Sequence, residues 1–202
     1  MSTLFIDFET TGITNFNLPP HHPSHPHVVQ WGAILDDDSG RVVAEMNLII
    51  KPDGFEIPSE ASAIHGITTA MALKHGVNLL GVMKLLNALM DRADEVVAHN
   101  MAFDGLMAAI EFYRLKMEKE LDRWRAKTRF CTMEASTGIL KIPGKFGKDF
   151  KWPNLQEAHV HFLGGRFEGA HDAMEDVRAC RRVYYKLQEH LKPAPQQFDL
   201  AP

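Results

Sequence analysis

The sequence predicts an α/β domain in which short apolar strands alternate with amphipathic helices. Three patterns indicate this class: a strand-length apolar run at residues 4–12, two strand-like runs within residues 28–51, and a long helical stripe of apolar residues in the last third. The length of 202 residues is ample for one core. We expect a single domain at residues 1–192, followed by a flexible tail at residues 193–202.

Composition excludes several classes of protein. The chain is 45% hydrophobic and 24% charged, with no apolar run near the roughly 18 residues that a membrane span needs, so no membrane partner is expected. No secretory leader is recognisable, and Cys131 and Cys180 lack metal-type spacing, so we expect reduced core thiols and a cytoplasmic location. The net charge of -4 argues against a broad basic face for duplex nucleic acid, but it allows nucleic acid held through bound cations.

The first predicted strand, Leu4–Gly12, carries two carboxylates. Successive side chains of a strand point to opposite faces, so Asp7 and Glu9 share one face. The other face is apolar: Leu4, Ile6 and Phe8. Like charges side by side repel, and burial adds a further cost unless a partner is present. The spacing alone is equally compatible with a half-exposed polar strand face and with a metal site.

A loop and a hairpin follow the first strand. Residues 15–27 are a predicted surface loop, because four prolines interrupt both helix and strand. Its histidines are His21, His22, His25 and His27. We favour a solvated loop over a weak metal site there. Val28–Leu35 and Arg41–Lys51 form a predicted antiparallel hairpin, joined by a solvated turn that contains three aspartates.

The middle of the chain is predicted to alternate helices with short strands. The expected elements are a short turn capped by Thr68 or Thr69, a helix at Leu79–Met90, a strand at Val96 and Val97, a helix that runs from about residue 101 toward Leu121, and a strand at Thr128–Thr132. Asp104 falls in the first turn of the second helix. An acidic residue is favoured there by the helix dipole, so taken singly it is a cap-region residue.

The last predicted helix carries an aspartate on its apolar stripe. The stripe is Ala173, Val177, Cys180, Val183, Tyr184, Leu187 and Leu191. Asp176 lies on it, and His171, five residues earlier, would be about 140° away around a helix, so we place His171 on the preceding loop. Before it, residues 141–153 carry four lysines and are predicted as a solvated loop, with a phosphate-contacting flap as the alternative. Another helix begins near Asn154.

Three segments together resemble the exonuclease motifs of the DEDD family. They are Asp7-Phe8-Glu9, His99-Asn100-Met101-Ala102-Phe103-Asp104, and His171 with Asp176. A histidine five residues before the final aspartate is typical of the DEDDh subgroup, which is similar to the proofreading subunit of bacterial replicative DNA polymerase and to RNase T. The segments Asp7–Gly12 and Ile64–Thr68 also look like sequences of this family.

The resemblance implies a ribonuclease H-like fold: a five-stranded mixed sheet with an antiparallel first half, the first strand central and helices on both faces. It also implies two divalent cations, Mg²⁺ or Mn²⁺, and hydrolysis from a nucleic-acid 3′ end that releases nucleoside 5′-monophosphates. Hard cations prefer oxygen ligands, which Asp and Glu supply. By resemblance, Asp7 bridges the two ions, Glu9 and Asp176 hold one, Asp104 supports the other, and His171 is the general base.

The same resemblance suggests substrate contacts. The residues are Thr10, Thr11, His65, Asn100 and Phe103. Phe103 could stack on an unpaired base, with a core role as the alternative, and a structural role is the alternative for His65.

Three functions remain open from the sequence. The favoured one is a DNA 3′–5′ exonuclease acting on single-stranded or frayed ends. The alternatives are an RNA 3′-end processing exoribonuclease and an inactive nucleic-acid-binding module. The motifs do not separate DNA from RNA, because that choice depends on how the site treats the 2′-hydroxyl. They also leave the oligomeric state and any polymerase partner unknown.

A short segment in the tail resembles a protein-docking peptide. Gln197, Phe198, Asp199 and Leu200 are similar to the peptides by which bacterial replication proteins bind the sliding clamp. The segment lacks the usual final aromatic residue. An inert tail is therefore the favoured interpretation.

Overall fold

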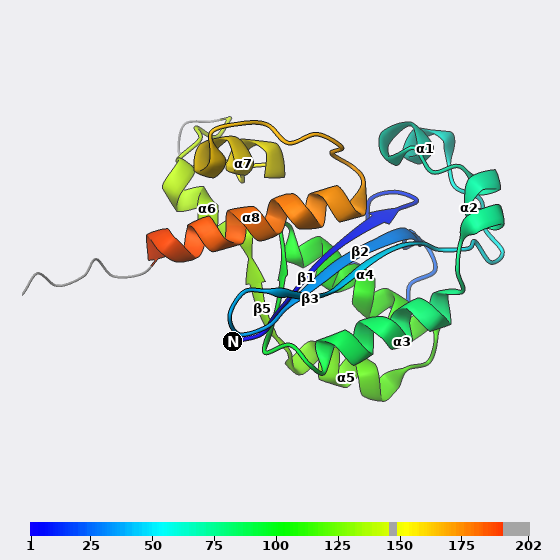
Figure 1. Ribbon diagram of the computed structural model, residues 1–202. Helices are drawn as coiled ribbons and strands as arrows, with labels where there is room; N and C mark the ends of the chain where they lie inside the picture. The colour runs from blue at the N-terminus through cyan, green and yellow to red at the C-terminus, as the bar shows by residue number, and fades with distance from the viewer. Residues whose placement is uncertain (146–148, 192–202) are drawn as a thin grey trace, which may run out of the picture.

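The structure is a computed structural model that describes residues 1–145 and 149–191. Its centre is a five-stranded sheet of order β3-β2-β1-β4-β5 (Figure 1). The strands are β1 (Thr3–Thr10), β2 (Val28–Asp36), β3 (Val42–Ile49), β4 (Glu95–Ala98) and β5 (Thr128–Cys131). The helices are α1 (Ser59–His65), α2 (Thr69–His75), α3 (Leu79–Met90), α4 (Met101–Arg114), α5 (Glu118–Ala126), α6 (Thr132–Leu140), α7 (Leu155–Leu163) and α8 (Ala173–Leu191).

The strand pairing confirms the expected mixed sheet. β1 pairs antiparallel with β2, and β2 pairs antiparallel with β3. On its other edge β1 pairs parallel with β4, which pairs parallel with β5. The first strand is therefore central, as predicted: β2 pairs with it from Thr3 to Thr10, and β4 pairs with its first three residues.

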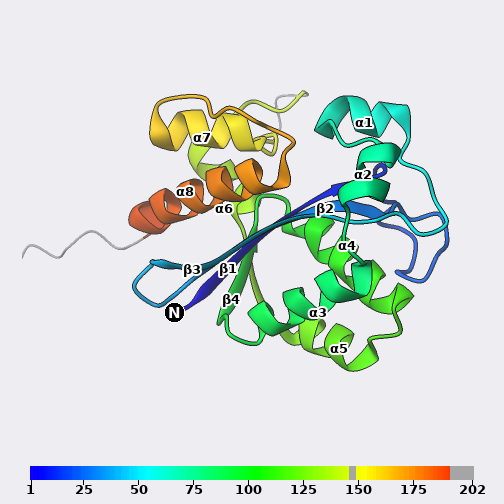
Figure 2. The same cartoon turned by 45° about the vertical axis from the view of Figure 1, so that its right-hand side comes forward.

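The two faces of β1 meet different helices. Leu4, Ile6 and Phe8 belong to a core that includes residues of α3, α4 and α5. Phe5 points the other way and packs with Met174 of α8. Figure 2 shows α3, α4 and α5 on one side of the sheet, with α6, α7 and α8 on the other. Strand alternation therefore turns the carboxylates of β1 toward α8.

A glycine on β2 lets α8 lie close to the sheet. A Cβ built on Gly32 would lie 2.4 Å from the carbonyl oxygen of Ala173. No side chain fits in that gap, so β2 must carry glycine where the first residue of α8 crosses it. Gly32 is also the register partner of Asp7. The close approach therefore occurs directly beside the first carboxylate of β1.

The prediction of one continuous helix from about residue 101 toward Leu121 is wrong. The chain forms two helices there, α4 and α5, separated by a turn in which Lys116 has a φ of 56°. The indole nitrogen of Trp124 donates a hydrogen bond of 2.9 Å to the carbonyl of Gly105. The turn brings α5 back against α4, so that Leu121 and Trp124 are buried. A straight helix would carry these two side chains away from the core.

Other helices differ from the sequence-based expectations. The segment that begins at Thr68 is not a short turn but helix α2, whose first turn is capped by the Thr68 hydroxyl. Helix α6 follows β5 directly and was not predicted at all. Asn154 does begin a helix, α7, and it forms a capping box with Glu157. These short helices depend on capping more than on a long apolar stripe.

The histidine-rich loop lies at the surface, as predicted, and it is anchored at its end, where His25 and Pro26 are buried. His25 is 3% exposed, and its ring nitrogens lie 2.7 Å from the hydroxyl of Thr14 and 3.0 Å from the carbonyl of Pro19. Arg114 of α4 donates to the backbone carbonyls of His25 and Pro26. One of the residues that anchor this loop, Arg114, is therefore distant from it in sequence.

The aspartate turn after β2 is also only partly solvated. Asp36 is 0% exposed and accepts hydrogen bonds from Arg181 at 2.7 Å and from the hydroxyl of Tyr185 at 2.5 Å. Both partners lie on α8. The first member of the triplet is therefore a link between the sheet and α8 rather than a turn residue.

Two predictions concern residues that the structure does not describe. The tail at residues 193–202, with the clamp-like segment Gln197–Leu200, lies outside the described residues.

Within residues 1–145 and 149–191, no helix combines the length and the apolar character that crossing a membrane requires.

Candidate active site

Two carboxylates of the site come from the end of the central strand. Asp7 and Glu9 are partly buried on β1, opposite Gly32 and Gln30 of β2. β2 pairs with β1 as far as Thr10, whereas β4 pairs only with residues 3–5, so at the two carboxylates the backbone is held by β2 on one edge, and the two side chains project together toward α8. This is the geometry that their spacing of two residues predicts for a strand.

The third carboxylate enters from the first turn of α4. Asp104 is 3% exposed, and its Oδ1 accepts a hydrogen bond of 3.2 Å from the backbone nitrogen of Phe8. That bond ties the start of α4 to β1 between the two strand carboxylates. Asn100, the residue that caps α4, makes no side-chain capping bond and is exposed. Its amide is therefore available to another group.

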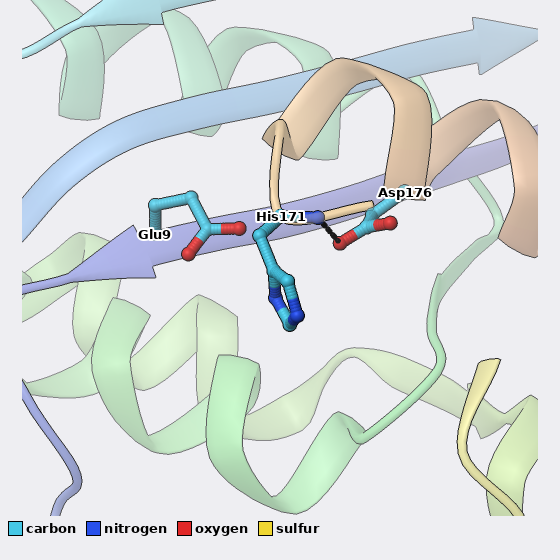
Figure 3. A group of neighbouring side chains, drawn as sticks. All are labelled: Glu9, His171 and Asp176. Carbon is cyan, nitrogen blue, oxygen red and sulfur yellow. Dashed lines mark hydrogen bonds between the residues drawn. The ribbon is translucent and has the colours of Figure 1, made fainter. Parts of the chain in front are cut away.

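The remaining two groups lie at the start of α8. His171 is on the loop before the helix, as predicted, and has a φ of 70°, which is uncommon for a residue other than glycine. Its backbone nitrogen donates to Oδ2 of Asp176 at 3.1 Å. Figure 3 shows this bond and the side chains of Glu9, His171 and Asp176 facing one another. Within the described residues these three form the one group of potential ligands whose atoms lie within 4.8 Å of one another.

Like charges and burial raise the pKa of every carboxyl group in the cluster. Desolvation, followed by the charges of Asp104, Asp176 and Glu9, raises the pKa of Asp7 well above its ordinary value of 3.8. Desolvation, followed by the charges of Asp176, Asp104 and Asp172, raises the pKa of Glu9 to about 8. Desolvation is also the main cause that raises the pKa of Asp104 to about 7 and of Asp176 to about 6.

One oxygen in the cluster has no partner. Oδ1 of Asp176 is buried, and no hydrogen-bond donor of the described residues reaches it. A buried carboxylate oxygen without a partner is costly, and desolvation together with neighbouring like charges raises the pKa of all four carboxyl groups. Divalent cations would remove both penalties, and an all-oxygen donor set suits Mg²⁺ or Mn²⁺. Asp7, Glu9, Asp104 and Asp176 therefore fit a cation-binding role.

The cluster opens into a cavity of about 440 Å³. The residues that line it are Asp7, Phe8, Glu9, Ile13, Phe16, His99, Asn100, Phe103, Asp104, Leu155, His171 and Asp176. The structure thus brings together all five residues expected to carry the chemistry, with two of the expected substrate contacts, Asn100 and Phe103. Phe103 is half-buried, and it both packs on the core and faces the cavity.

A second, apolar cavity of about 280 Å³ adjoins the first. Thr10, Thr11 and His65 line it, and Phe103 lines both cavities. The Thr10 hydroxyl donates to the carbonyl of Gly12 at 2.7 Å, and the Thr11 hydroxyl accepts from the backbone nitrogen of His27 at 2.9 Å. Both hydroxyls therefore hold the loop after β1, while the Thr10 oxygen can still accept and the Thr11 hydroxyl can still donate a hydrogen bond to a substrate.

His65 keeps one nitrogen free of protein partners. Its Nδ1 accepts from the backbone nitrogen of Ile67 at 3.1 Å, so the proton of a neutral ring lies on Nε2. Nε2 is buried without a hydrogen-bond partner among the described residues. Burial lowers the pKa of His65, and the nearby His171 lowers it further. The side chain is thus a neutral donor beside the second cavity.

His99 supports the site from behind. A carbonyl can only accept, so Nε2 of His99 donates to the carbonyl of Pro153 at 3.0 Å, and Nδ1 accepts from the hydroxyl of Thr132 at 2.9 Å. Burial lowers the pKa of His99 to about 4, which keeps the ring neutral. It joins β4 to α6 and to the segment before α7.

Several residues of the site were not identified from the sequence. Ile13 and Phe16 line the larger cavity and are 90% and 55% exposed, but they lie in a loop whose path the sequence does not specify. Gln30 is buried on β2 and contacts the start of α8. A glutamine in an apolar strand indicates a buried polar partner, and that was the one signal available.

Solved structures share this fold. The E. coli exonuclease I complex with a dT13 oligonucleotide is 22% identical with a TM-score of 0.71, and the match covers 93% of this chain and 41% of that chain. The zinc ion bound form of the E. coli exonuclease I complex with single-stranded DNA is 23% identical with a TM-score of 0.72, covering 95% of this chain and 41% of that chain. This chain therefore spans less than half of the proteins that it resembles, and the likeness shows the ribonuclease H-like exonuclease fold.

Comparison with models of protein families tests family membership rather than fold alone. No curated protein matches the chain. The family model RNase_T, described as "Exonuclease", matches residues 4–184, which include β1, the start of α4 and the start of α8. The chain therefore belongs to the exonuclease family, in its DEDDh 3′–5′ branch.

Proposed function

We propose that this protein is a metal-dependent 3′–5′ exonuclease that removes nucleotides from single-stranded DNA ends and releases nucleoside 5′-monophosphates. The observation that carries the proposal is the unpartnered, buried Oδ1 of Asp176 within a cluster of four carboxyl groups whose pKa values are all raised. Asp36 and Glu111 also have a buried oxygen without a partner, but each forms an ion pair with an arginine, whereas none of the four cluster carboxylates forms an ion pair with a lysine or arginine of the described residues. This cluster is instead arranged to accept cations.

Two divalent cations, magnesium or manganese, would be held by Asp7, Glu9, Asp104 and Asp176, where they would stabilise the attacking and leaving oxygens of an in-line displacement. The protein contributes a fixed donor set. Phe8 holds Asp104 through its backbone nitrogen, and β2 pairs with β1 from Thr3 to Thr10. Little reorganisation is then needed when substrate binds.

His171 is suited to accept a proton from the attacking water. A ligand atom of its ring lies within 4.8 Å of carboxylate oxygens of Glu9 and Asp176, and the ring is exposed to the cavity side where water enters. Asp176 fixes the backbone of His171 by accepting its N–H at 3.1 Å. An imidazole can take up a proton at a ring nitrogen during attack and release it to solvent afterwards.

The two adjoining cavities would receive the terminal nucleotide. The cavity at the carboxylates and the apolar one at Ile64 share a wall formed by Phe8, Glu9, Ile13 and Phe103. The phosphate would lie in the first and the base in the second. Structures of E. coli exonuclease I with dT13 and dA16 oligonucleotides support DNA as the substrate class. A cytoplasmic location and any sliding-clamp contact stay predictions.

Matched 5′-labelled single strands of DNA and RNA test the proposal. With Mg²⁺ or Mn²⁺, we expect a ladder of products that shorten from the 3′ end of DNA, and no products with EDTA. Asp7→Ala and Asp176→Ala should abolish the ladder while the circular dichroism spectrum stays that of the wild type. Faster hydrolysis of the RNA strand would replace the DNA proposal by an RNA 3′-processing activity. Binding of both strands without any hydrolysis would indicate a nucleic-acid-binding module.

A further inference from the structure

A third cavity lies between the histidine-rich loop, residues 15–27, and the turn that joins α4 to α5. Its volume is about 540 Å³, against about 440 Å³ for the cavity at the carboxylates. Polar side chains of both segments line it, among them those of His21, His22, Tyr113, Arg114 and Lys116. None of its lining residues lines either cavity of the candidate active site. It is therefore a separate site, which we name the loop cavity.

The walls of the loop cavity are held together by hydrogen bonds. Nη1 of Arg114 donates to the carbonyl of Pro26 at 2.8 Å, and Nη2 donates to the carbonyl of His25 at 2.6 Å. The turn after α4 is fixed as well, because the backbone nitrogen of Lys116 donates to the carbonyl of Tyr113 at 2.9 Å. A cavity whose walls are already fixed needs little ordering when a ligand binds.

The loop cavity is lined by hydrogen-bond donors that the described residues leave unused. The ammonium of Lys116 has no hydrogen bond or ion pair there. Arg114 has five N–H groups, and its bonds to two carbonyls and to Glu111 use three of them. Nδ1 of His22 accepts from the backbone nitrogen of Ser24 at 3.3 Å, so the proton of a neutral ring lies on Nε2, which has no partner among the described residues.

Charge and aromatic surface indicate which ligand these donors suit. Arg114 and Lys116, against the single carboxylate of Glu118, give the lining residues a formal charge of +1 on a chain whose total is -4. Tyr113 is 49% exposed, and the ring of His21 lies 5.5 Å from its ring. Arginine and lysine bind phosphate oxygens, and an aromatic face stacks on a planar ring. The matching ligand is therefore an anion that also carries a planar ring.

A metal ion fits the loop cavity less well than an anion. Within the described residues, no three ligand atoms of the histidine-rich loop lie within 4.8 Å of one another. Nε2 of His25 donates to the carbonyl of Pro19 at 3.0 Å, and Nδ1 accepts from the hydroxyl of Thr14 at 2.7 Å. The most buried histidine of the loop thus has no ring nitrogen left for a cation.

We infer that the loop cavity is a second binding site, which takes a nucleoside monophosphate. The phosphate binds Lys116 and the unused N–H groups of Arg114, and the base stacks on Tyr113. Glu118 accepts a hydrogen bond from a sugar hydroxyl. The cavity volume lies within the range of about 300–1,000 Å³ that is typical of small-molecule sites. Because this site shares no lining residue with the carboxylate cavity, the inference goes beyond the proposed nuclease activity and does not depend on it.

Calorimetry in EDTA separates the loop cavity from the active site. Without cations, the four carboxylates have nothing with which to hold a phosphate, and they repel it. We expect thymidine 5′-monophosphate to bind with one molecule per chain. Thymidine alone and inorganic phosphate alone should each bind at least about tenfold more weakly, because each makes only part of the contacts.

Two variants remove the cation and the aromatic ring separately. Lys116→Gln and Tyr113→Leu should each weaken the binding of thymidine 5′-monophosphate by about tenfold. The matched control is Lys119→Gln, which changes an exposed lysine of α5 that does not line the cavity and should leave binding unchanged. Circular dichroism spectra of all three variants check that the fold is intact.

A strand of nucleic acid is the other source of the same chemistry. A twelve-residue thymidine oligonucleotide with hydroxyl groups at both ends carries no terminal phosphate, so it reports binding of a strand. We expect its affinity to be equal in the wild type and in Lys116→Gln. If the oligonucleotide loses affinity in Lys116→Gln while thymidine 5′-monophosphate does not, the cavity holds a strand and the assignment to a mononucleotide is wrong.

The remaining outcomes also decide the inference. Thymidine 5′-monophosphate that binds equally to the wild type, Lys116→Gln and Tyr113→Leu, or that does not bind at about 10 mM, would overturn it. Nuclease activity plays no part in these measurements. A protein that hydrolyses neither DNA nor RNA would contradict the proposed function and leave the result for the loop cavity standing.

Discussion

Gln30 donates a hydrogen bond of 3.1 Å from Nε2 to Oδ2 of Asp172, and this bond joins β2 to the segment that carries His171. The same amide accepts from the backbone nitrogen of Ala173 at 3.2 Å. Asp172 in turn accepts from the backbone nitrogen of Met174 at 3.0 Å. One buried side chain therefore fixes the first turn of α8 above the carboxylates of β1.

Gln30→Ala should lower kcat more than it changes KM, because it releases the segment of His171 without touching the substrate cavities. We expect kcat to fall about tenfold and the free energy of unfolding to fall by about 1–3 kcal/mol, since the Ala173 nitrogen loses its acceptor. The control is Asn47→Ala, which removes only the third partner of the Gln30 amide, on β3. Equal kcat losses in the two variants would indicate a general stability effect and contradict a positioning role.

Asp7→Asn should make the metal-free protein more stable while it removes activity. The substitution removes a carboxyl group whose pKa is raised well above its ordinary value by burial and by the charges of neighbouring carboxylates. We expect the free energy of unfolding in EDTA to rise by about 1–2 kcal/mol and kcat/KM with Mg²⁺ to fall by at least about 100-fold. Urea unfolding and the 3′-end assay measure the two effects. Asp122→Asn, which changes an exposed carboxylate of α5, should change neither the free energy of unfolding nor kcat/KM.

The metal-free protein should lose stability as pH rises from about 6.5 to 8. The carboxyl group of Glu9 has a pKa of about 8 when folded against 4.5 ordinarily, and that of Asp104 has a pKa of about 7 against 3.8. The folded state therefore keeps protons that the unfolded state has lost, and this stabilisation disappears as pH passes through the folded-state values.

Two buried histidines act in the opposite direction but only at lower pH. Burial lowers the pKa of His27 and His99 to about 4 from 6.5, so their contribution rises with pH and is complete above about 6.5. Above about pH 6.5 the carboxylates alone determine how the free energy of unfolding changes with pH. Saturating Mg²⁺ should reverse this change, because cations compete with protons for the same oxygens. Urea midpoints that are flat over this range in EDTA would contradict the raised pKa values.

Asp36→Ala should destabilise the fold without changing the chemistry. Asp36 is fully buried and binds Arg181 and Tyr185, and its removal leaves both donors without their acceptor. Because the Arg181 side chain is 24% exposed, water compensates part of the loss, and we expect about 2–3 kcal/mol by urea unfolding. kcat should stay within a factor of about two where the variant is folded. A larger kcat loss would place this link in the active site.

The strands were predictable because their signal is local. Alternation along β1 assigned Asp7 to the face opposite Leu4, and apolar runs located the other strands near their observed bounds. The break between α4 and α5 was not predictable, since it depends on how Trp124 reaches Gly105. Likewise, nothing near His25 in the sequence identifies Arg114 of α4 as the group that anchors its carbonyl.

The chemistry of the site was predictable only from several residues together. Asp104 alone is an ordinary first-turn residue, and Asp7 with Glu9 alone fits a polar strand face. An aspartate on the apolar stripe of α8 makes the set unusual, because it needs a partner. The supporting residues Gln30, Ile13 and Phe16 could not be identified in this way, since their roles follow from which loop or helix lies above them.

The order of elements along the chain also has a consequence during synthesis. Asp7 and Glu9 lie on the first strand, whereas His171 and Asp176 lie at the start of the last helix. A ribosome-bound chain that has not yet released α8 contains only three of the four carboxylates and no base. On the proposed chemistry, a nascent chain that lacks α8 therefore cannot hydrolyse the nucleic acids around it. Hydrolytic activity appears only when α8 packs onto the sheet.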